Sequence, residues 1–358
     1  MSPSKGTGTI SLLVATKDRS NFMARLLHYY ADVGFQGRIM IGDSSGEEHL
    51  DGTLRTVESL SSKLDIVHHH YPGLWNTEAS NELLRQVETE YSAFLPDDDF
   101  LCASGLEECA TFLDSNADYA SAHGLGVMFS LKNGSSWGEI AGVYHYAQGT
   151  LENQTGHQRF KDLFSNYFVT MFSVHRTETA RHIYQGEPGV AEWSFCCELL
   201  PNALSAVYGK AKELDCLYLI RQHHDQRYAL PDTFDWMTNP DWSSSYQAFL
   251  SRLVEVLVDH DGITREEAAG VVKSSFIAYI KGRMDQECWN GIPLSTKLKS
   301  TARSVPGVRT VRNAARTLLP KRPETISMDD LLKPSSKYHQ DFMPIYRAIT
   351  TPVEAPVS

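Results

Sequence analysis

Long apolar runs, cysteine motifs and an excess of positive charge are all missing from this chain. No stretch approaches the roughly 18 consecutive apolar residues of a membrane span, and the run at 10–15 is too short for a signal-peptide core. The six cysteines show no Cys-x-x-Cys spacing, which predicts a reduced, cytoplasmic protein. With 33 Lys+Arg against 44 Asp+Glu, the formal charge of −11 argues against a partner made of nucleic acid.

The composition is that of an ordinary globular protein. Hydrophobic residues make up 42% and charged residues 22% of the 358 positions, enough apolar material for a sizeable core. At about 100–200 residues per domain, this length indicates two domains, or one large domain with an appendage.

The first hundred residues alternate between short apolar runs and helical patterns. Expected strands lie at 10–15, 38–42, 64–68 and 91–95, with expected helices at 20–35, 50–60 and 76–87. This order predicts a parallel, doubly wound sheet of the α/β class. The first turn, at 15–19, contains no Gly-x-Gly-x-x-Gly, which argues against a dinucleotide dehydrogenase.

The rest of the chain predicts an antiparallel extension of the sheet and a C-terminal helical part. Helices are expected at 105–113, 158–166, 177–185, 192–208, 245–259 and 265–283, and strands at 167–175 and 214–221. Thr264 and Glu267 form a capping box. The aromatic stretch at 234–242 is expected to pack the last helices onto the sheet, with an acceptor-side lid as the alternative.

Three consecutive carboxylates, Asp97, Asp98 and Asp99, follow directly after the apolar run at 91–95. Ligands of open parallel sheets bind beyond the carboxyl ends of the strands, so the cluster lies where a site is expected. Adjacent anions repel one another, and Mg²⁺ or Mn²⁺ would relieve that repulsion and bridge to the phosphates of a nucleotide. The alternative is an acidic turn that caps the next helix.

Together these features resemble the GT-A fold glycosyltransferases, specifically the family 2-like enzymes of bacterial surface polysaccharide synthesis. The resemblance is carried by ISLLVATKDR at 10–19, by IMIGDSS at 39–45, and by FLPDDDF at 94–100, where the family has its DxD motif. It covers residues 8–230 and implies a Rossmann-like, mostly parallel sheet flanked by helices.

The resemblance also implies donor and metal contacts. In that family the first turn and the end of the second strand hold the base and ribose, and the DxD carboxylates hold ribose and metal. Asp99 is thereby placed on a Mn²⁺ or Mg²⁺ ion. The implied contacts to the donor nucleotide come from Thr16, Asp18, Arg19, Asp43, Asp97 and Asp98.

An inverting transfer needs a carboxylate to take the proton of the acceptor hydroxyl. The Glu-Asp pair of many family members is missing from the second half, and Glu192 and Glu198 are the candidates instead. Six residues apart on an α-helix, they differ in direction by about 240°, so only one faces the site. We favour Glu198, because its apolar neighbours raise the pKa of a carboxyl group. Glu187, Asp225 or a wholly structural role are the other possibilities.

The strand expected at 214–221 runs into a polar cluster. GT-A enzymes often complete the metal shell or clamp the diphosphate from this part of the fold. His223 or His224 is therefore a candidate metal ligand, and Arg221 a candidate for neutralising phosphate charge. The three histidines at 68–70 are not expected to bind one ion, since adjacent residues of a strand point to opposite faces.

The segment at 295–322 is strongly basic. It holds eight Lys or Arg and no Asp or Glu, so the remainder of the chain carries −11 − 8 = −19. This predicts contact with an anionic partner, most simply a membrane surface, with a solvated basic linker as the alternative. We divide the chain into a transferase domain at 8–230, a helical subdomain at 231–294, and the basic segment with a loosely ordered tail at 295–358.

The resulting hypothesis is a metal-dependent glycosyltransferase of the hexosyltransferase type. It takes a nucleotide-sugar donor and a glycan or lipid-linked acceptor, and inversion follows from the resemblance alone. A sugar-1-phosphate nucleotidyltransferase would need a Gly-rich loop after the first strand, and residues 15–20 contain no glycine. A non-catalytic sugar-nucleotide or glycan binding protein is the other alternative, and it would not need Glu198.

Overall fold

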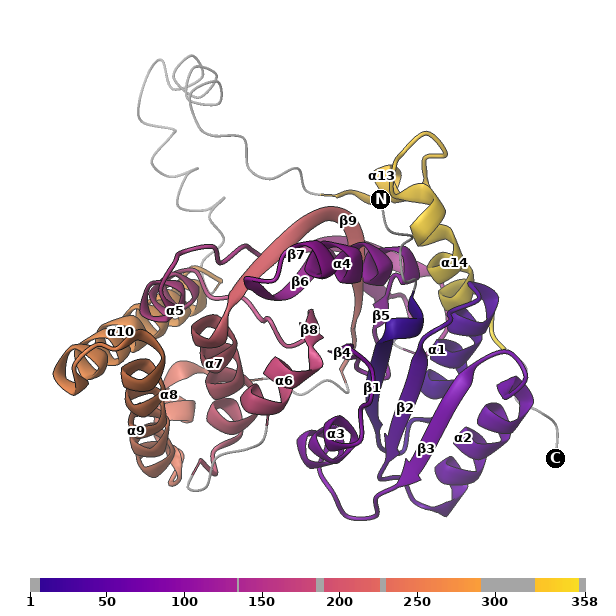
Figure 1. Ribbon diagram of the computed structural model, residues 1–358. Helices are drawn as coiled ribbons and strands as arrows, with labels where there is room; N and C mark the ends of the chain where they lie inside the picture. The colour runs from indigo at the N-terminus through magenta and orange to yellow at the C-terminus, as the bar shows by residue number, and fades with distance from the viewer. Residues whose placement is uncertain (1–6, 134, 185–189, 226–229, 291–325, 354–358) are drawn as a thin grey trace, which may run out of the picture.

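A sheet with helices on both faces forms the frame of the protein, seen here in a computed structural model (Figure 1). The structure describes residues 7–133, 135–184, 190–225, 230–290 and 326–353. None of the helices in these segments combines the length and apolar character needed to cross a bilayer.

The first half of the sheet is parallel, with the strand order β3-β2-β1-β4, and confirms the predicted doubly wound arrangement. Strand β1 is buried on both sides: Leu12 and Val14 face one hydrophobic cluster, and Leu13 faces the other. The elements are β1 (Ile10–Thr16), α1 (Ser20–Asp32), β2 (Arg38–Asp43), α2 (Glu47–Leu60), β3 (Asp65–His70), α3 (Asn76–Arg85) and β4 (Tyr91–Phe94).

The second half of the sheet is mixed and runs β4-β8-β6-β9-β5, with β7 paired to β6. The β6–β7 hairpin is antiparallel, as predicted, whereas β6 and β9 pair in parallel. The strand expected at 167–175 forms only at its end, because the amide of Thr170 donates to Asn202 Oδ1 (2.9 Å) instead of to a neighbouring strand. The strands are β5 (Phe100–Leu101), β6 (Tyr119–Leu131), β7 (Ile140–Tyr146), β8 (Val174–Arg176) and β9 (Lys210–His223).

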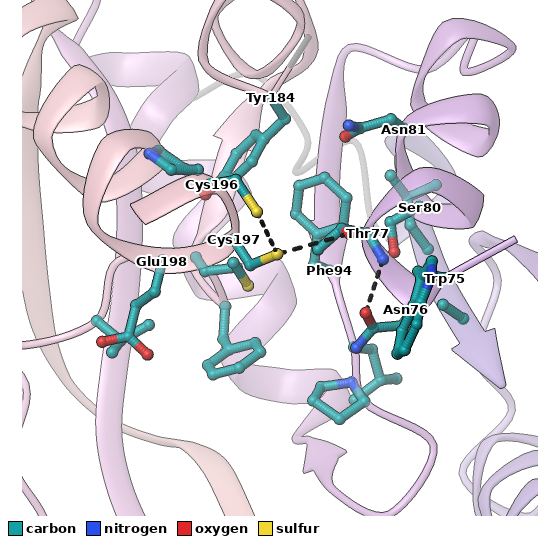
Figure 2. A pocket seen from close by; sticks show the side chains of 18 of the residues that line it. Trp75, Asn76, Thr77, Ser80, Asn81, Phe94, Tyr184, Cys196, Cys197 and Glu198 are labelled. Atoms are coloured by element: carbon teal, nitrogen blue, oxygen red, sulfur yellow. Dashed lines mark hydrogen bonds between the residues drawn. The ribbon is translucent and has the colours of Figure 1, made fainter. Parts of the chain in front are cut away.

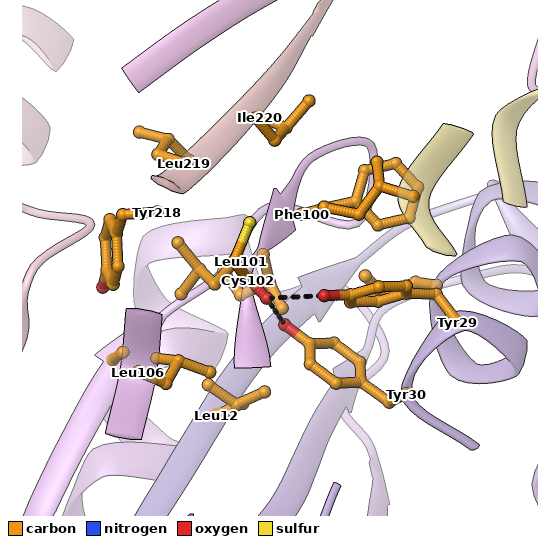
Figure 3. Close-up of a cluster of buried hydrophobic side chains, with 14 of the residues drawn as sticks. Leu12, Tyr29, Tyr30, Phe100, Leu101, Cys102, Leu106, Tyr218, Leu219 and Ile220 are labelled. Carbon is orange, nitrogen blue, oxygen red and sulfur yellow. Dashed lines mark hydrogen bonds between the residues drawn. The ribbon is translucent and has the colours of Figure 1, made fainter. Parts of the chain in front are cut away.

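Two hydrophobic clusters lie on opposite faces of the sheet. The first, part of which is seen in Figure 3, includes the buried faces of α1 and α4, and the second those of α3, α5, α6, α7, α9 and α10. The capping box of Thr264 and Glu267 before α10 is present, with the Glu267 amide donating to Thr264 Oγ1 (3.2 Å). The remaining elements up to residue 290 are η1 (Thr7–Thr9), α4 (Ala103–Ser115), α5 (Gly156–Ser165), α6 (Thr177–Ile183), η2 (Phe195–Leu199), α7 (Leu200–Tyr208), α8 (Thr233–Met237), α9 (Trp242–Asp261) and α10 (Arg265–Asn290).

The helix expected over 192–208 forms over 193–208, but residues 195–199 (η2) are π-helical and the α-helical part α7 begins at Leu200. Pro201 has no N–H to donate to the carbonyl of Cys197, as an α-helical turn would require, which favours the π-helical segment before it. The extra residue per turn changes the directions of the side chains of η2, so the 240° argument for the two glutamates does not apply.

The aromatic stretch at 234–242 packs partly as expected, through Trp236 against helices η2 and α10 rather than against a strand. Trp236 is fully buried, with its ring centroid 5.3 Å from that of Phe195 and 6.3 Å from that of Phe276. Phe234, two residues earlier, is 67% exposed. The basic segment at 295–322 lies outside the described residues.

The prediction of a loosely ordered tail is wrong for residues 326–353. They form α13 (Met328–Leu332) and α14 (His339–Thr350), and α14 packs against α1 (Figure 1). Phe342, Ile345 and Ile349 recur at helical spacing and are fully buried in the first cluster. Asp341 accepts a hydrogen bond from Ser104 Oγ of α4 (2.7 Å), so this segment completes the core.

We therefore expect Phe342→Ala to destabilise the protein by about 3–5 kcal/mol, the usual effect of emptying a buried aromatic site. Urea unfolding followed by circular dichroism measures the change. Arg347→Ala, on the exposed face of the same helix, is the matched control. Equal unfolding midpoints for the two variants would contradict the packing of α14 into the core.

Candidate active site

A cavity of about 700 Å³ opens where β1 and β4 end, between α3 and the π-helix η2 (Figure 2). Six of the side chains that the sequence predicts for a site line it: Thr16, Arg19, Asp97, Asp98, Glu198 and Arg221. The other six lie outside its wall: Asp18, Asp43, Asp99, Glu192, His223 and His224. The fold thus brings the carboxylates after β4 and the glutamate of η2 to one space.

Asp97 and Asp98 are joined to the first turn of the chain. Thr16 Oγ1 donates to Asp97 Oδ2 (2.7 Å), and Arg19 Nη1 donates to Asp97 Oδ1 (3.0 Å) and Asp98 Oδ2 (3.1 Å). Burial, and then the charge of Asp98, raise the pKa of Asp97. Burial acts the same way on Asp98, but the hydrogen bond from His224 and the charge of Arg19 outweigh it and lower the pKa of Asp98. Asp98 therefore ionises more readily than Asp97.

Asp99 is directed away from the cavity and holds Arg221 in place. Arg221 Nε donates to Asp99 Oδ2 (2.7 Å), the amide of Gln222 donates to Asp99 Oδ1 (2.9 Å), and the Asp99 side chain is 1% exposed. Arg221 Nη1 also donates to the hydroxyl of Tyr146 (3.0 Å), and its guanidinium lies over the rings of Tyr146 and Phe172. Both Asp99 oxygens are engaged, so its assignment as a metal ligand stays a prediction with little geometric support.

A buried arginine, Arg25 of α1, supports the cluster from behind. Its Nη2 donates to the carbonyl of Asp98 (2.6 Å), and its Nη1 to Gln222 Oε1 (2.5 Å) and the carbonyl of Ser136 (2.6 Å). Burial lowers the pKa of Arg25 to about 10, against the opposing effect of the aspartates, so it stays charged at neutral pH. Together with Arg19 and Arg221 it balances the three carboxylates, and relief of their repulsion requires no metal ion.

His224 and His223 differ in their surroundings. His224 is buried, with Nε2 2.7 Å from Asp98 Oδ2, and its ring stacks on Phe22. His223 ends β9 and is exposed. Within the described residues no group of three or more His, Cys, Asp or Glu is placed to hold a metal ion. Asp98 Oδ2 lies within hydrogen-bond distance of both His224 Nε2 (2.7 Å) and Arg19 Nη1 (3.1 Å).

The end of β2 is held by local contacts. Asp43 is fully buried, and it accepts from the amide of Ser45 (2.9 Å) and lies 3.3 Å from His68 Nε2. Burial raises its pKa, but the hydrogen bond with His68 outweighs that effect and the pKa of Asp43 is lowered. Asp18, at a positive φ of 54°, accepts from the amide of Gly46 (2.9 Å). These two carboxylates shape the turns around the cavity, and Ser44 contributes to its wall.

Glu198 of η2 lines the cavity, and its carboxyl group lies on the side of Cys197 that is away from α3 (Figure 2). Burial raises its pKa, while a hydrogen bond from Tyr167 and the charges of Arg221 and Arg283 partly oppose the shift. The Tyr167 hydroxyl accepts in turn from Asn202 Nδ2 (2.9 Å). A carboxylate with a raised pKa, held by a tyrosine, is suited to accept a proton.

Glu192 has a capping role instead. Its Oε2 accepts from the amide of Phe195 (3.2 Å), and its Oε1 accepts from Ser194 Oγ (3.3 Å), at the start of the helix that contains η2. Its own amide donates to Ser245 Oγ of α9 (2.9 Å). Of the two glutamates, only Glu198 reaches the cavity.

Sequence reasoning missed several residues of the site. Arg25 lies on the buried face of α1 with Phe22 and Leu26, and an arginine on an apolar helix face is the signal that indicates it. Cys196 and Cys197 line the cavity next to Glu198, with their Sγ atoms 3.0 Å apart. No sequence pattern indicates Tyr146 as a site residue, because only the β6–β7 hairpin brings it to Arg221.

Comparisons with known proteins give only distant matches. No protein-family model and no curated protein matches the chain. A crystal structure of S. aureus TarS is 16% identical with a TM-score of 0.47, over 75% of this chain and 43% of that one. A crystal structure of S. aureus TarS 1–349 in complex with UDP-GlcNAc is likewise 16% identical with a TM-score of 0.47, over 76% of this chain and 72% of that one. At this level of similarity, we base the function on the geometry of the cavity.

Proposed function

We propose that the chain is a glycosyltransferase that moves a sugar from a nucleotide-sugar donor to an acceptor hydroxyl. One observation carries the proposal: Glu198 lines the same cavity as the charged group formed by Asp97, Asp98, Arg19 and Arg221. The cavity lies at the carboxyl ends of parallel strands, where open α/β sheets bind their ligands. Anion-binding arginines and a carboxylate with a raised pKa therefore meet at one ligand-sized space.

The chemistry assigns a role to each side of the cavity. Arg19 and Arg221 stabilise the negative charge that develops on the diphosphate. The acceptor oxygen forms a bond to the anomeric carbon as the bond from that carbon to the phosphate oxygen breaks, which releases a nucleoside diphosphate. Glu198 takes the proton of the acceptor hydroxyl. Inversion at the anomeric carbon is part of this proposal.

A Mn²⁺ or Mg²⁺ ion is also part of the proposal, held by Asp98 and His224 rather than by Asp99. Such an ion would add charge stabilisation to that of the arginines. Asp98 Oδ2 and His224 Nε2, which lie 2.7 Å apart, would be its two protein ligands.

The cellular setting is inferred from the sequence. We propose a cytoplasmic, hexosyl-transferring enzyme of cell-surface polysaccharide synthesis, with a glycan or lipid-linked acceptor and peripheral membrane contact through 295–322. Sedimentation with anionic liposomes at low and high salt tests the membrane contact, and no binding at low salt would exclude it.

A thermal-shift screen tests donor binding. UDP-GlcNAc and GDP-, CMP- and dTDP-linked sugars are added with and without Mn²⁺. A nucleotide that binds only the folded state stabilises it by about 2.7 kcal/mol at 100 times Kd. We expect nucleotide sugars with one of these bases to raise the unfolding midpoint, and to raise it further with Mn²⁺. Asp98→Asn should remove most of this shift in midpoint.

Asp51→Asn, on the exposed face of α2, is the control for the change of charge. If no nucleotide moves the midpoint under any condition, the donor site is not where we place it and the transferase proposal fails. If a donor binds but no nucleoside diphosphate is released with any acceptor tested, the chain is better described as a non-catalytic binding protein.

A further inference from the structure

The cavity extends from Glu198 along a wall of mainly apolar side chains. Met171 and Phe172 precede β8, and Cys197, Leu200 and Leu204 come from η2 and α7. Phe94 of β4 closes the side toward the sheet, and all of these except Met171 are buried. We call the space along this wall the apolar arm. Besides Glu198, the ionisable side chains that line the cavity are Lys17, Arg19, Asp97, Asp98 and Arg221, together with His182 of α6 and Arg252 of α9.

The opposite wall of the apolar arm is short and polar. It consists of Thr77, Ser80 and Asn81 of α3, and Figure 2 shows them across the space from Cys197 and Tyr184. The walls approach each other where Cys197 Sγ lies 3.6 Å from Thr77 Oγ1, a weak contact that a ligand can displace. The arm therefore has one apolar side and one side that offers hydrogen bonds.

Tyr184 marks a polar point within the apolar arm. Its ring packs edge-on against Phe94, with centroids 4.5 Å apart, and the residue is 5% exposed. Its hydroxyl has no hydrogen-bond partner among the described residues. Buried hydroxyl groups are costly when unpaired, so this group favours a ligand or ordered water in the arm.

Two exposed apolar side chains border the same cavity. Trp75, just before α3, is 73% exposed, and Leu230 is 37% exposed. Large apolar groups at the rim of a cavity are typical of a site that admits an apolar ligand.

From these observations we propose that the acceptor is amphiphilic: its reactive hydroxyl faces Glu198 and an apolar group next to that hydroxyl fills the apolar arm. This inference rests on the proposed transferase function and narrows its acceptor class. A fully hydrophilic glycan would leave the wall of Met171, Phe172, Cys197, Leu200 and Leu204 in contact with water. The transfer itself is unchanged: the acceptor oxygen bonds to the anomeric carbon, the nucleoside diphosphate leaves, and Glu198 receives the proton.

The probes are octyl and methyl β-D-glucopyranoside, which share the sugar and differ only in the alkyl group. Octyl glucoside is kept below its critical micelle concentration. Burying a few methylene groups predicts about tenfold or tighter binding of the octyl compound by calorimetry. With the donor identified in the thermal-shift screen, octyl glucoside should also accelerate release of the nucleoside diphosphate more than methyl glucoside does.

Asn81→Trp fills the apolar arm from the helix side without removing a core residue. We expect it to abolish the octyl preference while the donor-induced thermal shift is retained. Glu82→Trp is the matched control, since Glu82 forms a surface ion pair with Arg85 and does not line the cavity. It should keep both the octyl preference and the donor shift.

The outcomes separate the acceptor inference from the donor proposal. Equal binding of the two glucosides, or an octyl preference that survives in Asn81→Trp, overturns the amphiphilic acceptor while a donor shift still supports the transferase. Octyl binding without any donor shift overturns both, because the apolar arm then belongs to a binding site with no transfer.

Discussion

Glu198→Gln is expected to lower sugar transfer by about 10²–10⁴-fold, the usual contribution of a general base, while donor binding is retained. The amide is close in size to the carboxyl group and keeps the contact with the Tyr167 hydroxyl, but it cannot accept the acceptor proton. Release of nucleoside diphosphate at saturating donor measures the effect. Wild-type kcat/KM should fall on the acid side as Glu198 becomes protonated, at a pH above the usual range of a carboxyl group, because burial raises its pKa.

The same substitution should stabilise the fold at neutral pH. A carboxyl group whose pKa is higher in the folded than in the unfolded state contributes stability that is complete below the unfolded pKa. That contribution is lost as the pH rises through the folded pKa, because the buried carboxylate must then ionise. At a pH above the folded-state pKa of Glu198, the unfolding midpoint of Glu198→Gln should therefore exceed that of the wild type. The difference between the two midpoints should disappear at acid pH.

Glu192→Gln is the matched control for both measurements. It weakens the contacts with the Phe195 amide and Ser194 Oγ, so we expect a loss of about 1 kcal/mol in stability and little loss of transfer. The reverse pattern, with transfer lost in Glu192→Gln and kept in Glu198→Gln, would contradict the assignment of the base.

Arg25→Leu should destabilise the protein by about 3–5 kcal/mol, as expected for removing one member of a buried charged network. The substitution leaves the carbonyls of Asp98 and Ser136 and the amide oxygen of Gln222 without their donor. It also leaves three buried carboxylates facing two arginines. The shift of the urea midpoint at constant slope gives the change in free energy.

Arg25→Lys keeps the charge but not the planar guanidinium that reaches three acceptors. Its stability should therefore lie between those of the wild type and Arg25→Leu. Arg55→Leu, on the exposed surface of α2, controls for the loss of an arginine. If Arg25→Leu unfolds at the urea concentration of the wild type, the charge balance described here does not hold the cluster together.

The parallel half of the sheet could be predicted because its information is local. Each of β1, β2 and β4 is a short apolar run buried on both faces, and α1, which follows β1, has a clear apolar stripe. The carboxyl end of β4 follows from that order, and so does the position of the Asp cluster at the edge where ligands bind.

The α/β class, the parallel strands and the edge at which the carboxylates gather follow from the sequence alone, since continuous apolar runs and helical spacing are properties of neighbouring residues. Only the tertiary structure decided which carboxylates face the cavity. Asp99 turns inward because Arg221 and Gln222 lie beside it, and Arg25 reaches Asp98 from another helix. It likewise decided that α14 completes the core. These contacts join residues 73 to 237 positions apart, and no local pattern encodes the meeting of such distant side chains.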